Sequence, residues 1–87
     1  MTLRPNRRAA NLRSFNSALA AFQRAERRVD RRPSLRARAA YGASIERLIA
    51  TPSPDVAGLA AKLAAVDPFG LEHHAAILAD ARRLAGL

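Results

Sequence analysis

The residues of this chain with the clearest chemical potential are arginines that recur on one side of a predicted helix. At about 100° per residue, five of them fall within an arc of about 100°. Arginine keeps its charge and forms paired hydrogen bonds with phosphate oxygens. The pattern therefore predicts a surface that binds nucleic-acid phosphates, made of Arg13, Arg24, Arg27, Arg28 and Arg31.

The same arc contains no aromatic residue, only small side chains such as Ser17 and Ala20. Base stacking on aromatic rings is therefore not expected, and binding would depend on phosphate contacts. Two other interpretations stay open at this stage. The arginines could form an ordinary solvated helix face, or they could bind an acidic protein.

Residues suited to catalysis or metal binding do not occur in useful patterns. His73 and His74 are adjacent, so on a helix they point about 100° apart and cannot readily share a metal ion. No serine stands in a G-x-S-x-G turn, and the four glycines do not form a phosphate-binding loop. We expect no catalytic residue, no metal site and no cofactor, and hence no enzyme.

The positive charge is concentrated in the first half of the chain. Residues 1–38 contain eleven arginines and two carboxylates, whereas residues 39–87 contain four basic and five acidic residues. This asymmetry indicates a polyanionic partner, either nucleic acid or an anionic membrane surface. No apolar stretch is long enough for a membrane span or a secretory signal, so a cytoplasmic location is expected.

Prolines and small polar residues separate four alanine-rich segments of helix-forming residues. They predict one all-α domain over residues 1–87, with a flexible N-terminus at 1–6 and helices over about 7–31, 34–50, 54–66 and 68–85. Asn6 is the expected N-cap of the first helix. Ser53, followed by Pro54 at the first helical position, is the expected N-cap of the third. The arrangement would be a small four-helix bundle, or a helical hairpin with two shorter helices.

Large apolar residues of the first helix recur every three or four positions and predict its buried face. They are Leu12, Phe15, Leu19 and Phe22. Their partner is either the second helix or a second copy of the chain. Because 87 residues with many alanines can form only a thin core, a homodimer is a natural expectation.

Two C-terminal segments resemble those of a group of short uncharacterised alphaproteobacterial proteins. The segment TPSPDVAGLAAKL at 51–63 is similar to a TPAPDLAALAAKL-like helix start, and ADARRL at 79–84 to a D-x-R-R-L-like C-terminal segment. The resemblance covers about the last 36 residues. It implies an all-helical fold, and it brings no activity or binding residue with it.

These patterns favour a small, non-enzymatic helical protein that binds nucleic acid through its arginine-rich first helix. The alternative is a helical interaction or assembly module, such as an adaptor or a mobile-element accessory protein, without a nucleic-acid role.

Overall fold

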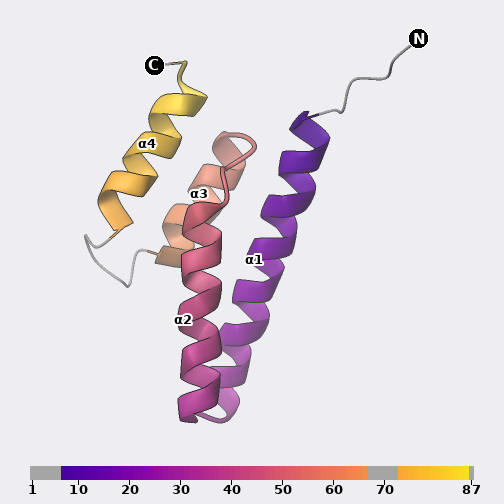
Figure 1. The fold of residues 1–87 in the computed structure, drawn as a ribbon, viewed down its shortest axis with the longest axis vertical. Coiled ribbons are helices and arrows are strands. Elements are labelled where there is room, and N and C mark those ends of the chain that lie inside the picture. Colours follow the sequence, from indigo (N-terminus) through magenta and orange to yellow (C-terminus); the bar gives the residue numbers. More distant parts are fainter. Residues whose placement is uncertain (1–6, 67–72, 87) are drawn as a thin grey trace.

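The computed structural model describes residues 7–66 and 73–86, which form four α-helices (Figure 1). The helices are α1 (Arg7–Arg31), α2 (Leu35–Ala50), α3 (Val56–Val66) and α4 (His74–Leu84). No strand occurs within the described ranges. The all-helical prediction is therefore confirmed for this part of the chain. Asn6 and the predicted start of the last helix at 68 lie outside it.

Helices α1 and α2 form a long antiparallel hairpin with a short, well-ordered turn (Figure 1). The amide of Arg32 donates to the Arg28 carbonyl at 2.9 Å, and the Ser34 amide donates to the Arg32 carbonyl at 2.9 Å. Ser34 is the N-cap of α2, because its hydroxyl oxygen accepts from the Ala37 amide at 3.0 Å. Pro33 cannot donate a backbone hydrogen bond and limits the conformations of this turn.

The hydrophobic core lies between α1 and α2 near the end of the hairpin that is distant from the turn. Its buried members are Phe15, Ala18, Phe22, Ile45 and Leu48. The Phe22 and Tyr41 rings add a tilted contact, with centroids 5.5 Å apart. The apolar face of α1 is thus packed against α2 of the same chain.

The four residues predicted for the apolar face of α1 differ in how deeply they are buried. Phe15 and Phe22 are buried, Leu19 is partly buried against them, and Leu12 is 44% exposed. Leu12 is therefore not buried against α2, and its burial against a second copy of the chain stays a prediction. Ala18 and Phe22 mark the buried face, and Leu12 lies about 120° and 80° from them around the helix. Its side chain therefore projects beside the core.

The first turn of α3 differs from its prediction. The helix begins at Val56, and the Asp55 carboxylate accepts from the Gly58 amide at 2.7 Å. Asp55 is therefore the cap, and the assignment of Ser53 as N-cap was wrong. The reason is that the Ser53 hydroxyl donates to another carboxylate, that of Asp80 in α4.

Helices α3 and α4 lie at one end of the hairpin and leave its turn end projecting (Figure 1). After α4, Gly86 adopts a left-handed φ of 77°, and its amide donates to the Arg83 carbonyl at 3.2 Å. The arrangement is less regular than a bundle of four equal helices, because α3 and α4 have 11 residues each and α1 has 25. Within the described ranges, no helix has the length and apolar character needed to cross a membrane.

Candidate functional site

Four of the five predicted phosphate-binding arginines line one hollow beside the hairpin turn. The hollow has a volume of about 790 Å³. The four arginines are exposed and belong to the last two turns of α1. They are joined by Arg32 of the turn, and the lining consists of Arg24, Arg27, Arg28, Arg31, Arg32, Ser34 and Ala37.

A second hollow continues the first along the hairpin. It measures about 400 Å³ and shares Arg24 and Arg28 with the hollow at the turn. Its other lining residues have small side chains that leave space between the helices: Ala21, Ala25, Ala40 and Ser44. We call the two hollows together the basic groove. Arginines flank it on α1, and small residues of both helices form its floor.

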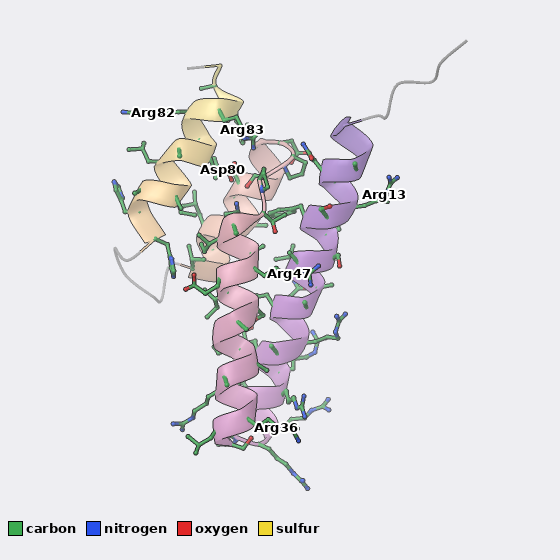
Figure 2. The ribbon with its side chains drawn as sticks, viewed as in Figure 1. Arg13, Arg36, Arg47, Asp80, Arg82 and Arg83 are labelled. Atoms are coloured by element: carbon green, nitrogen blue, oxygen red, sulfur yellow. The ribbon has the colours of Figure 1, made fainter. Side chains whose placement is uncertain are left out.

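Arg47 of α2 marks the end of the basic groove that lies away from the turn. Its guanidinium donates to the Ser17 hydroxyl of α1 at 3.0 Å. Ser17 stands one helical turn before Ala21, and Arg47 one turn after Ser44, so this bond crosses between the helices just beyond the second hollow. Figure 2 shows Arg47 beside α1 and Arg36 at the turn end of α2.

Arg13 is the predicted site residue that the basic groove does not include. It is exposed on α1 and contributes to neither hollow. Figure 2 places it near the opposite end of α1 from the turn. The structure therefore brings four of the predicted arginines together and leaves the fifth apart.

The arginines of the basic groove carry charge that nearby carboxylates do not neutralise. Both ion pairs found in the described part of the chain involve Asp80, far from the groove. Two acidic residues of the hairpin, Glu26 and Asp30, act on Tyr41. Burial raises the pKa of the Tyr41 hydroxyl, and the negative charges of Glu26 and Asp30 raise it further. The Tyr41 hydroxyl donates to Glu26 at 3.3 Å. The groove therefore presents cationic side chains available to an external anion.

A second polar cluster is buried where α3 and α4 meet the segment after α2. Asp80 is its centre, because its carboxylate accepts from the Ser53 amide at 3.1 and 3.2 Å and from the Ser53 hydroxyl at 2.5 Å. The Lys62 ammonium donates to it at 2.8 Å. Lys62 is 1% exposed and Asp80 8%. A buried charge pair of this kind needs such a complete set of hydrogen bonds.

Arg83 and Thr51 complete this arrangement, which we call the Asp80 cluster. Arg83 donates to the Asp80 carboxylate at 2.7 Å and also to the Ser53 carbonyl. Figure 2 shows Asp80 and Arg83 directed toward the segment between α2 and α3. Lys62 donates to the Thr51 carbonyl at 2.6 Å. Among the described residues, no buried side-chain nitrogen or oxygen lacks a partner. The cluster therefore fastens α3 and α4 to the hairpin and offers no unsatisfied group to a ligand.

Acid should weaken the Asp80 cluster over a defined pH range. Burial alone would raise the pKa of Asp80, but hydrogen bonds from Lys62, Ser53 and Arg83 outweigh it and lower the pKa from 3.8 to about 2. A carboxyl with a lowered pKa stabilises the fold above its ordinary pKa, and this stabilisation is lost as the pH falls through the folded value. The free energy of unfolding should therefore fall by about 2 kcal/mol from pH 5 to pH 2 on account of Asp80.

Urea denaturation at a series of pH values tests this expectation, with Asp80→Asn as the reference. The amide does not titrate, so the free energy of unfolding of the variant should lack the pH dependence that Asp80 contributes. It should keep the pH dependence that the other carboxyls contribute. Equal pH dependence in the two proteins would contradict the assignment of the low pKa to Asp80.

The Asp80 cluster was not anticipated from the sequence, although a signal for it existed. Lys62 is the only lysine of the chain and stands in an otherwise apolar helix. Such a residue requires a buried partner or an exposed position. Two short segments, 51–63 and 79–84, supply all five members of the cluster.

The part of the chain covered by the structure contains no group of three histidine, cysteine or acidic side chains placed to hold a metal ion. No protein-family model matches the chain, and no curated protein or solved structure is significantly similar to it. The basic groove is therefore the candidate functional site of this protein.

Proposed function

We propose that this protein is a non-enzymatic nucleic-acid-binding protein whose basic groove holds the phosphate backbone. The observation that carries the proposal is the convergence of five arginines, from α1 and the turn, on one hollow of about 790 Å³. Those side chains are not engaged in ion pairs with the described carboxylates. Concentrating like charges in this way has an electrostatic cost, which a bound polyanion removes.

The length of the basic groove suits several successive phosphates. From Ala21 to Arg31, the stretch of α1 that lines the groove, the helix advances about 15 Å, at about 1.5 Å per residue. One strand of a duplex advances about 3.4 Å per nucleotide, so the groove faces about four nucleotides. Its lining contains no aromatic side chain. The contacts would therefore position the backbone without reading base identity.

Fluorescence anisotropy of a labelled DNA duplex tests this function directly. We expect binding at about 50 mM salt that weakens steeply as salt is added, with similar affinity for duplexes of unrelated sequence. Absence of binding to duplex DNA and RNA at about 50 mM salt would refute the proposal.

The alternative, a helical interaction or assembly module, has support from a different surface. Lys62 is the only polar side chain of α3 and points inward, so the exposed face of this helix is apolar. Val56 is 72% exposed and Leu63 44%, and Leu78 of α4 is also exposed. Exposed apolar patches are typical of protein interfaces. Homodimerisation would be one such use, and light scattering over a concentration series distinguishes it from a monomer.

A further inference from the structure

Arg47 reaches from α2 across the hairpin, and its side chain lies beside α1 (Figure 2). Its guanidinium donates to the Ser17 hydroxyl of α1 at 3.0 Å. Both residues are exposed. Because water competes for exposed donors and acceptors, this hydrogen bond contributes little to the stability of the fold. Its main effect is to hold the Arg47 guanidinium in one place, just beyond the basic groove.

Ser17 lies in a gap within a line of arginines along α1. The positions within about 40° of one another around this helix are Arg13, Ser17, Arg24 and Arg31. Arg13 and Arg24 are about 16 Å apart along α1, at about 1.5 Å per residue, and no basic residue stands between them in sequence. A guanidinium held at Ser17 divides this gap into steps of about 6 Å and about 10 Å. Arg47 of α2 therefore supplies the positive charge that α1 itself lacks at this point.

The Arg47 guanidinium remains able to bind an anion while it is held by Ser17. A guanidinium has five N–H donors, and the bond to Ser17 uses one of them. Neither ion pair found in the described part of the chain involves Arg47 or Arg13. Hydrogen bonds from arginine to phosphate oxygens are strengthened by the charges of both groups. A phosphate beside Ser17 would therefore find a positioned cationic donor.

We propose that Arg47, held in place by Ser17, is a phosphate-binding residue that joins Arg13 to the basic groove in one continuous track for a duplex backbone. The proposal rests on the nucleic-acid-binding function above and extends its site. From Arg13 to Arg31, α1 advances about 27 Å. At about 3.4 Å per nucleotide, the track faces about eight nucleotides, twice as many as the basic groove alone. Ser17 is a positioning residue, because it acts through Arg47.

The first test measures the salt dependence of binding to a DNA duplex of about 12 base pairs, which is long enough to cover the track. Arg47→Ala and Arg13→Ala should each reduce the magnitude of the slope by about one. Together, Arg13 and Arg47 would add about 1.8 to the slope that the arginines of the basic groove produce. The matched control is Arg38→Ala, which removes an exposed arginine from the opposite side of α2, about 180° from Arg47. It should leave the slope unchanged.

The second test separates the position of Arg47 from its charge. Ser17→Ala keeps every arginine, so the slope should stay close to that of the wild type. The released Arg47 side chain must then be ordered on binding, which should lower the affinity at about 50 mM salt about two- to tenfold. Ser17→Thr keeps a hydroxyl acceptor and should restore the affinity of the wild type. A purely structural role of the serine would not give this combination of results.

The outcomes separate the track from the function on which it rests. If Arg47→Ala binds like Arg38→Ala, the track is refuted and phosphate binding by the basic groove stands. A lower melting temperature of Arg47→Ala with an unchanged slope would also overturn the proposal and assign the bond to hairpin stability. Wild-type affinity in Ser17→Ala would refute the positioning by Ser17. If no duplex is bound by the wild type, both proposals fail. Circular dichroism verifies the fold of each variant.

Discussion

Replacing Asp80 with alanine is expected to lower the free energy of unfolding by about 3–5 kcal/mol. The substitution removes the acceptor for the Ser53 amide and hydroxyl and for Lys62. The Lys62 ammonium, 1% exposed, would keep only the Thr51 carbonyl as a hydrogen-bond partner. A buried charge without its counterion is among the most destabilising defects in a small protein. Urea denaturation followed by far-UV circular dichroism at neutral pH measures the loss.

The companion variant Lys62→Ala should be less destabilising than Asp80→Ala. After it, Asp80 still accepts hydrogen bonds from Ser53 and Arg83, and Arg83 is exposed enough to adjust. Arg82→Ala, next to the cluster in sequence but exposed, should change the free energy by less than about 0.5 kcal/mol. If Asp80→Ala does not fold, Asp80→Asn supplies the comparison. A greater loss for Lys62→Ala than for either Asp80 variant would contradict the central role of the carboxylate.

The helices themselves could be predicted because their signals are local. Alanine-rich segments separated at Pro33 and at 51–54 predict helices that end there, and α1 and α2 begin and end within about one residue of expectation. The spacing of Phe15 and Phe22 identified the buried face for the same reason. Leu12 fits the same spacing, but its place at the edge of that face left it exposed.

The Asp80 cluster could not be predicted because its bonds join residues far apart in sequence. Lys62 and Asp80 are 18 residues apart, and Ser53 and Asp80 are 27 apart. Ser53 precedes a helix, where serine is a common N-cap, so local rules favoured the wrong role. Asp55 took that role because its carboxylate reaches the Gly58 amide, which left the Ser53 hydroxyl to Asp80. The choice between the two roles is made by tertiary packing.

The basic groove could be predicted from the sequence only in part. A helical wheel is sufficient to gather Arg24, Arg27, Arg28 and Arg31 on one side of α1. It does not show that α2 returns beside them to give the floor its small residues, or that Arg47 reaches across to Ser17. These features follow from the antiparallel pairing, which the sequence indicates only through the short connection at Pro33.

Reversing the charge of two groove arginines is expected to abolish most of the proposed nucleic-acid binding. If Arg24, Arg27, Arg28 and Arg31 each neutralise one phosphate, the logarithm of the affinity should fall with that of salt with a slope of about −3.6. Between 50 and 200 mM salt the affinity would then decrease roughly 150-fold. In the double variant Arg24→Glu with Arg28→Glu, the slope should drop to about −1.8, and the affinity at about 50 mM salt should be more than tenfold lower.

The control must distinguish the effect of where a positive charge lies from the effect of the overall net charge. Arg28→Glu and Arg82→Glu change the net charge equally, but Arg28 lines both hollows, whereas Arg82 is exposed on α4 and points away from the groove (Figure 2). Because exposed charges beyond about 10 Å are largely screened at 0.1 M salt, Arg82→Glu should leave the slope close to that of the wild type. Arg28→Glu should reduce the magnitude of the slope by about one. Equal effects of the two substitutions would mean that the overall positive charge, and not the basic groove, attracts the nucleic acid.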